Sequence, residues 1–188
     1  MLENLGLMAV AGFCAKVVDE IAERRLAIRA IEPVILAVIY GLSMGWLASQ
    51  TLLGPLLLAL AVASLLSGKI DHPYHMVGAA CFALIFISLP LLTFDPWWFA
   101  LFLVSGLLDE LDLGKPKSGV LAVFNQQRLW TPLAVVGAVV MLGAPILFLF
   151  AIVCFDIFYR FGGWIVELRY PQAGASPMPG KAKGRRKR

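Results

Sequence analysis

Charged residues are scarce in this chain of 188 residues. Asp, Glu, Lys and Arg together make up 15% of it, whereas 60% of the residues are hydrophobic. Soluble domains contain roughly 25% charged residues. The composition therefore excludes an intrinsically disordered chain and argues strongly against a soluble globular domain. The class that remains is a polytopic integral membrane protein, surrounded by the lipid bilayer.

Charges are absent altogether from long stretches. No Asp, Glu, Lys, Arg or His occurs at positions 33–68 or 129–155, and Asp95 is the only one between 76 and 108. A membrane span needs about 20 apolar residues. Residues 33–68 and residues 76–108 therefore each have room for two helices. Turn residues at Gly54-Pro55 and Asp95-Pro96 divide them near the middle.

The sequence thus predicts an all-α, polytopic membrane helix bundle of about six spans. It forms one domain, residues 1–169, followed by a disordered basic tail, residues 170–188. The expected helices cover residues 5–23, 33–48, 52–66, 73–92 and 96–111. The last apolar block allows two interpretations, and the number of spans depends on them. Residues 131–153 form a single span, or a hairpin broken at Gly143-Ala144-Pro145 with arms at 131–142 and 145–162.

The distribution of basic residues favours the hairpin. Cytoplasmic loops of membrane proteins carry an excess of Lys and Arg, and a hairpin places all 16 Lys and Arg on one side. We therefore expect an inner-membrane protein with its N-terminus outside and its C-terminus in the cytoplasm. The basic tail is a topology signal or, alternatively, a binding site for anionic lipid. No nucleic-acid partner is expected, and the oligomeric state is open.

Motifs of common chemistries are missing. The three cysteines have no CxxC spacing, and the chain contains no G-x-G-x-x-G, P-loop or G-x-S-x-G sequence. The motifs of CDP-alcohol phosphotransferases, membrane prenyltransferases and CPBP-type proteases are also absent. A candidate site must therefore come from the placement of single charged residues.

Carboxylates gather at one level of the expected bundle. With this topology only Glu3 and Asp95 lie outside, and the other acids lie toward the cytoplasm, several of them within helices. Ionisable groups inside a membrane are costly unless paired or hydrated, and they suggest a functional site. We expect one water-filled pocket, open to the cytoplasm, that is lined by Asp19, Asp71, His75, Asp109, Asp112 and Asp156.

Such a pocket would suit Mg²⁺ or Mn²⁺ and a phosphate-bearing substrate, because hard cations prefer oxygen ligands. The metal ligands would be Asp19, Asp109, Asp112 and Asp156. Catalytic roles would fall to Asp109, Asp112, Asp71 and His75. Lys69 and Arg160 would hold the phosphate. These assignments predict a metal-dependent enzyme of lipid metabolism that acts on a lipid or isoprenoid phosphate.

Simpler interpretations stand beside these roles. Asp71 would cap the helix that starts at Pro73, and Asp156 would pair with Arg160 four residues later. Two other functions also remain open. One is a small cation- or proton-coupled transporter or channel, since intramembrane acids serve such carriers. The other is a non-catalytic accessory subunit whose cytoplasmic face binds a partner.

Overall fold

The structure is a computed structural model that describes residues 2–24, 26, 31–92, 94–110 and 128–171. These residues form seven α-helices and no β-strand. The helices are α1 (Leu2–Arg24), α2 (Ile31–Gln50), α3 (Gly54–Leu66), α4 (Pro73–Ser88), α5 (Pro96–Glu110), α7 (Trp130–Leu142) and α8 (Leu147–Arg169). The all-α prediction is thereby confirmed for the described part. Six of the expected helices agree with the observed ones to within four residues at each end, whereas α8 continues to Arg169, beyond the predicted arm at 145–162. The basic tail beyond residue 171 lies outside the described residues.

The last apolar block is a hairpin and not a single helix. Gly143 ends α7 in the left-handed conformation, with φ of 69°, and its backbone N–H donates to the carbonyl of Ala138. Ala144 donates to the same carbonyl at 3.0 Å. Glycine adopts this conformation without the steric penalty that other residues pay. Pro145 follows within two residues and the chain re-enters a helix at Leu147. The Gly143-Ala144-Pro145 break is therefore where the sequence placed it.

Two of the described helices, α2 and α8, are long and apolar enough to cross a membrane. The other five do not pass the same test of length and composition. The α3, α4 and α7 helices are apolar but have only 13, 16 and 13 residues. At about 1.5 Å per residue, they are shorter than the roughly 30 Å of bilayer hydrocarbon. The expectation of about six spans is not confirmed.

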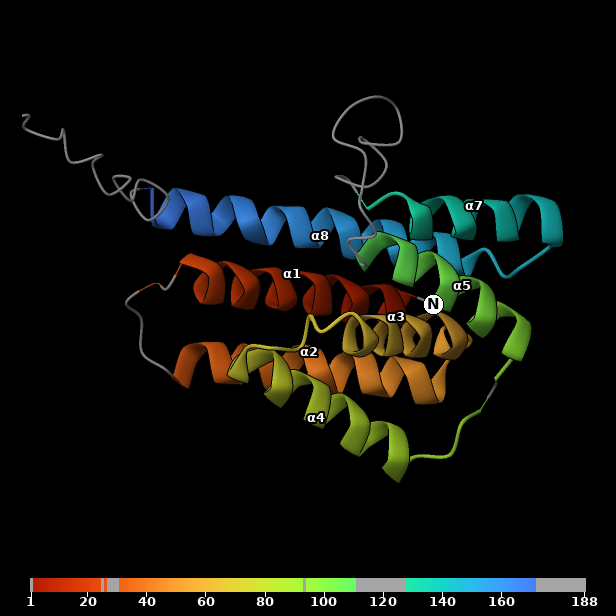
Figure 1. Ribbon diagram of the computed structural model, residues 1–188, viewed down its shortest axis with the longest axis horizontal. Coiled ribbons are helices and arrows are strands. Elements are labelled where there is room, and N and C mark those ends of the chain that lie inside the picture. The colour runs from red at the N-terminus through yellow and green to blue at the C-terminus, as the bar shows by residue number, and fades with distance from the viewer. Residues whose placement is uncertain (1, 25, 27–30, 93, 111–127, 172–188) are drawn as a thin grey trace, which may run out of the picture.

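Helix α1 lies between α8 on one side and α2 on the other, and α4 covers the far side of α2 (Figure 1). Glycine residues allow α1 to approach α8 closely, and they allow α2 to approach α4 closely. A Cβ atom on Gly12 of α1 would lie 2.5 Å from the carbonyl oxygen of Phe155 in α8. A Cβ on Gly41 of α2 would lie 2.2 Å from the carbonyl oxygen of Gly78 in α4. Such backbone proximity is typical of helices that pack inside membranes.

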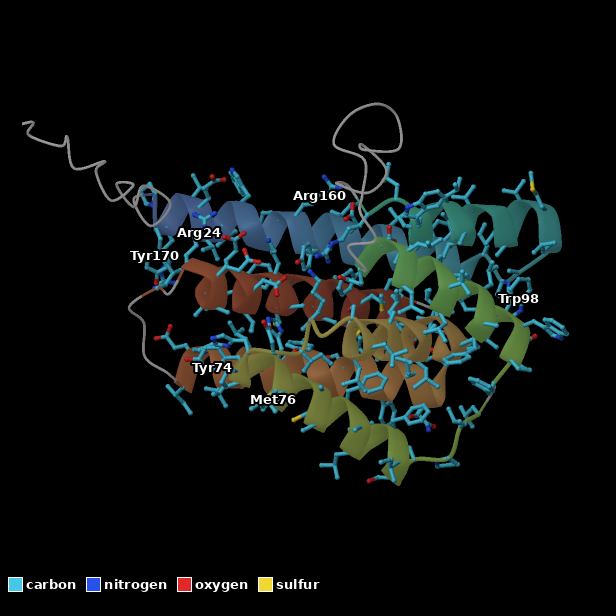
Figure 2. All side chains as sticks on the ribbon, viewed as in Figure 1. Arg24, Tyr74, Met76, Trp98, Arg160 and Tyr170 are labelled. Carbon is cyan, nitrogen blue, oxygen red and sulfur yellow. The ribbon has the colours of Figure 1, made fainter. Side chains whose placement is uncertain are left out.

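The apolar core is concentrated at one end of the bundle. There α3, α5 and α7 join the first turns of α1 and α8 (Figure 1). Phe102 of α5 and Phe148 of α8 are fully buried, with ring centroids 5.2 Å apart. Trp98, labelled in Figure 2, packs against both rings. Apolar packing at this end therefore holds the short helices α3, α5 and α7 against the long ones.

The opposite end of the molecule is formed by the long helices α1, α2 and α8, and α4 begins near it (Figures 1 and 2). The last turns of α1 and α8 and the first turns of α2 project past the ends of α3, α5 and α7 (Figure 1). Arg24 and Tyr170 mark this projecting end in Figure 2. Exposed apolar side chains continue along it, including Ile35, Trp164 and Leu168. The short helices consequently end partway along the long ones.

Candidate functional site: a hydrogen-bonded chain across four helices

Asp19 of α1 is the centre of the most extended polar contact in the described structure. Its Oδ1 lies 3.0 Å from Nε2 of His75 in α4. Its Oδ2 accepts a short hydrogen bond from the hydroxyl of Tyr159 in α8. The side chain of Asp19 is only 25% exposed and that of His75 only 19%. One carboxylate therefore ties together three helices that are far apart in the sequence.

His75 extends this chain to a fourth helix. The hydroxyl of Tyr40 in α2 lies 3.4 Å from Nδ1 of His75 and 3.5 Å from the carbonyl oxygen of the same residue. Tyr40 reaches this position because Gly78 has no side chain. A Cβ on Gly78 would lie 2.1 Å from the tyrosine ring. Tyr40, His75, Asp19 and Tyr159 thus form a continuous polar path, which we call the relay.

The relay lies near the middle of the two helices that are long enough to span. Tyr40 is central in α2 (Ile31–Gln50), and Tyr159 is just past the centre of α8 (Leu147–Arg169). Tyr40 has apolar neighbours on both sides in α2, whereas Tyr159 is followed by Arg160, which pairs with Asp156 on the surface of α8. The sequence placed the charged groups at the cytoplasmic ends of the helices. Asp19 does lie near the C-terminal end of α1, and His75 lies in the first turn of α4. These two side chains nevertheless meet beside the middle of α2 and α8.

Basic and acidic groups of α1 flank the relay. Lys16 pairs with Glu20 at 2.9 Å, and Arg24 pairs with the other oxygen of Glu20. The Lys16 ammonium also lies 5.1 Å from the centre of the Tyr159 ring. Gly163 of α8 leaves room for the Lys16 side chain, because a Cβ there would lie 3.2 Å from Cε. Lys16 therefore pairs with Glu20 while its charge stays close to the relay.

The turn before α4 brings further polar groups toward the relay. His72, rather than Asp71, caps this helix: its Nδ1 accepts from the backbone N–H of Tyr74 at 3.4 Å. The His72 and His75 rings lie edge to face, with centroids 6.4 Å apart. Asp71 and Lys69 are both exposed. The two residues predicted for catalysis and phosphate binding thus face out of the bundle, beside the relay.

Asp109 has a different environment. It is 6% exposed, and its two oxygens accept the backbone N–H groups of Trp130 and Thr131 at 2.9 and 2.8 Å. These are the first two residues of α7, whose N–H groups have no partner within the helix. Asp109 thus joins the end of α5 to the start of α7. Its neighbour Glu110 pairs with Arg128 at 3.2 Å.

Asp156 and Arg160 form an ion pair at 2.9 Å on the surface of α8. Both side chains are more than half exposed, and Arg160 projects on the side of α8 away from α1 (Figure 2). The simpler interpretation of this pair, an i, i+4 ion pair, is thereby confirmed. Asp112, the remaining predicted ligand and catalytic residue, lies outside the described residues.

Among the predicted site residues that the structure describes, two pairs are in direct contact: Asp19 with His75 between α1 and α4, and Asp156 with Arg160 on the surface of α8. Within the same ranges no three His, Cys, Asp or Glu side chains are placed to hold a metal ion. The expected Mg²⁺ or Mn²⁺ site stays a prediction, because Asp112 is not among the residues compared.

Two members of the relay were missed from sequence, namely Tyr40 and Tyr159. The signal that would have found them is their position. The chain has four tyrosines. Tyr74 and Tyr170 lie at helix ends, where aromatic residues are common in membrane proteins. Tyr40 and Tyr159 instead lie in the middle of helices, where a buried hydroxyl needs a hydrogen-bond partner.

Comparisons with protein-family models, with curated proteins and with solved structures give no match for this chain. The functional interpretation consequently rests on the relay and its surroundings.

Proposed function

We propose that the chain is a polytopic integral membrane protein that exchanges a small cation for protons. In this proposal the Asp19–His75 pair is the proton site. The membrane part is supported by composition and by α2 and α8, which pass the test for spanning helices. Most residues in the apolar segment of each are not buried in the bundle. A core helix of a soluble protein would be mostly covered, so lipid is the natural surrounding for these faces.

The relay is the observation that carries the proposal. Carboxylate and imidazole groups inside a membrane are expensive, and Asp, Glu and His chains there serve as proton relays in pumps and transporters. The relay connects four helices at mid-length of α2 and α8. A group that only stabilised the fold would not need an ionisable pair at this depth.

The geometry allows His75 to hold a proton in two states. In the neutral state Nε2–H donates to Asp19, and Nδ1 accepts from the Tyr40 hydroxyl. When Nδ1 takes up a proton it can no longer accept, so the Tyr40 hydroxyl must turn to another acceptor. The carbonyl oxygen of His75, 3.5 Å away, is within reach. Protonation would therefore rearrange the contact between α2 and α4.

A cation would compete with the proton for the same negative charge. Asp19 is neutralised by the imidazolium of His75 when the relay is protonated. When His75 is neutral, it no longer balances the negative charge of Asp19, and this charge attracts a cation through the polar turn that carries Asp71. Binding of one charge then weakens binding of the other, which is the basis of exchange.

The metal-dependent enzyme and the accessory subunit have less support. The enzyme needs several carboxylates within reach of one metal, at direct distances near 2 Å. In the described part, Asp109 and Asp156 instead have partners of their own. Neither hypothesis accounts for the relay.

Transport is tested with the purified full-length chain in liposomes that enclose a pH-sensitive dye. Na⁺, K⁺, Mg²⁺ and Mn²⁺ are added outside, one at a time, and the internal pH is followed. We expect at least one cation to raise the internal pH as protons leave. The variants Asp19→Asn and His75→Asn should abolish the signal, because each removes one side of the proton site.

The matched control is Asp156→Asn, which removes a carboxylate from the exposed surface of α8 and should leave exchange unchanged. Equal incorporation of all variants is checked by extraction from the liposomes. The proposal fails if none of the four cations moves protons. It also fails if Asp19→Asn exchanges as fast as the natural chain.

A further inference from the structure

A hollow of about 200 Å³ lies between α1, α2 and α8 at the projecting end of the bundle. Most of its wall is apolar and comes from all three helices: Phe13, Val17, Ile21, Leu36, Ile165 and Val166. Glu32, Arg169 and Tyr170 complete the lining. Apolar walls and opposite charges thus meet in one recess.

The hollow follows from how the long helices pack. Both α2 and α8 pack extensively on α1, whereas their contacts with each other are few at most. A strip of α1 at Phe13, Val17 and Ile21 consequently faces the gap between them. Val17 and Asp19 are two residues apart, which places them about 200° apart around a helix of 3.6 residues per turn. The hollow and the relay therefore lie on different faces of α1.

The charges of the hollow lie at helix ends. Glu32 is the second residue of α2 and Arg169 is the last residue of α8, and both are exposed. In a membrane, ends of spanning helices lie at the level of the lipid head groups. A guanidinium binds phosphate through paired hydrogen bonds, and a carboxylate attracts an ammonium group. The two residues are complementary to a head group that carries both charges.

We propose that this hollow binds one phospholipid of the cytoplasmic leaflet whose head group carries a phosphate and an ammonium group, as phosphatidylethanolamine does. Arg169 holds the phosphate and Glu32 holds the ammonium group. A stretch of one acyl chain lies against Val17 and Ile165. The volume is below the roughly 300–1,000 Å³ of small-molecule pockets, so it suits part of a chain rather than a whole ligand. The inference rests on the membrane part of the proposed function and not on proton exchange.

Lipid binding is tested by native mass spectrometry of the full-length chain in detergent, with equal amounts of phosphatidylethanolamine and phosphatidylglycerol added. We expect one retained phosphatidylethanolamine per chain, in preference to phosphatidylglycerol. Arg169→Gln should weaken its binding by about tenfold or more, since a hydrogen bond between charged groups is lost. Glu32→Gln should remove the preference, because phosphatidylglycerol lacks the ammonium group.

The matched control is Arg160→Gln, an exposed arginine on the same helix that points away from α1. It should leave lipid binding unchanged. Val17→Trp should fill the hollow and abolish binding, with the helical content and elution volume checked against the natural chain. The proposal is overturned if phosphatidylglycerol binds equally or better. It is also overturned if Arg160→Gln weakens binding as much as Arg169→Gln, which would indicate unspecific attraction.

The two proposals can fail separately. Glu32→Gln and Arg169→Gln should exchange protons normally in the liposome experiment, and Asp19→Asn should bind phosphatidylethanolamine normally. Lipid binding without any cation–proton exchange would support the lipid site and contradict the proposed transport function. Recovery of the chain in the soluble fraction would contradict both proposals.

Discussion

Single residues in this chain combine structural and functional roles that their types do not reveal. Asp19, Asp109 and Asp95 are aspartates within or next to apolar helices, yet their partners differ. Asp19 meets an imidazole and a phenol, whereas Asp109 and Asp95 accept backbone N–H groups at the start of α7 and α5. The partner, and not the residue type, separates a candidate proton site from a helix cap.

The two caps differ in burial, which predicts a difference in stability. Asp95 is only partly buried and accepts from Trp97 and Trp98 at 2.8 and 3.4 Å. Asp95→Ala should cost about 0.5–2 kcal/mol, as for other helix caps. Asp109→Ala leaves two backbone N–H groups without an acceptor, and one of these groups is buried. This variant should cost about 1–3 kcal/mol per unsatisfied group. Thermal unfolding in detergent, followed by circular dichroism, measures both variants.

An equal or smaller loss for Asp109→Ala would contradict the structural role of Asp109. Loss of transport with unchanged stability would instead return Asp109 to the candidate site. Asp109→Asn separates the two further. The amide oxygen can still accept one of the two N–H groups, so this variant should be less destabilising than Asp109→Ala.

The histidines allow the protonation state of the relay to be observed directly. The chain has only two, His72 and His75. In their neutral forms we expect both rings to carry their proton on Nε2. The Nδ1 atom of His72 accepts from Tyr74, and Nε2 of His75 faces the Asp19 carboxylate. NMR of ¹⁵N-histidine-labelled protein distinguishes the tautomers, and His72→Gln assigns the signals.

Replacement of Asp19 provides the check on this assignment. Asp19→Asn should alter the tautomer of His75 and leave the His72 signals unchanged. A neutral His75 with its proton on Nδ1 would mean that Asp19 and His75 are not hydrogen-bonded as described. The relay would then lose its central link.

At the level of elements, much of the helix pattern could be predicted from sequence, because uncharged runs and turn residues act locally. Gly143 and Pro145 marked the hairpin, and Pro73 and Pro96 marked helix starts. The pairing of helices could not be predicted, since it depends on which small residues face each other. Nothing near Gly41 in the sequence indicates that its partner is Gly78. For the same reason the sequence predicts Asp19 and His75 in one pocket but does not predict their direct contact.

The α2–α4 contact predicts a sharp contrast between two glycines. Gly41→Ala should lower the free energy of unfolding by about 1–3 kcal/mol, because its Cβ would overlap the Gly78 carbonyl oxygen and Cys81. It should also disturb the relay, since Tyr40 precedes it. The control is Gly137→Ala in α7, where no atom lies within 4 Å of the added Cβ. That variant should be neutral or stabilising by up to about 1 kcal/mol.

Unfolding and exchange are measured on the same preparations of both variants. If Gly41→Ala is as stable as the natural chain and exchanges normally, α2 and α4 cannot be as close as described. If Gly137→Ala is equally harmful, the loss would reflect substitution in a membrane helix in general and not the contact.

On the scale of the whole molecule, the unequal helix lengths explain how polar groups reach mid-length of the long helices. The α3 helix ends early, and the turn between it and α4 carries the exposed residues Lys69 and Asp71. This turn is close to the relay, because His72 and His75 are in ring contact. Exposed charges at this depth need water. We therefore expect a water-filled recess beside the projecting ends of α1, α2 and α8, open to the cytoplasm.

The recess makes Lys69 a test of depth and orientation together. In a chain whose three cysteines are replaced by serine or alanine, Lys69→Cys should react with a membrane-impermeant maleimide from the cytoplasmic side only. The recess admits water and the loops on this side are basic. Asp95→Cys should react only from the other side, since one helix lies between them. Val140→Cys, on the exposed apolar surface of α7, should not react from either side because lipid covers it.

Intact cells and inverted vesicles allow labelling from the outside and from the cytoplasmic side, and a reporter fused after Arg188 locates the tail. Labelling of Lys69→Cys from the outside, or of positions 69 and 95 from the same side, would exclude this topology. Labelling of Val140→Cys from either side would show that α7 faces water, and the bundle would then be less deeply embedded than proposed.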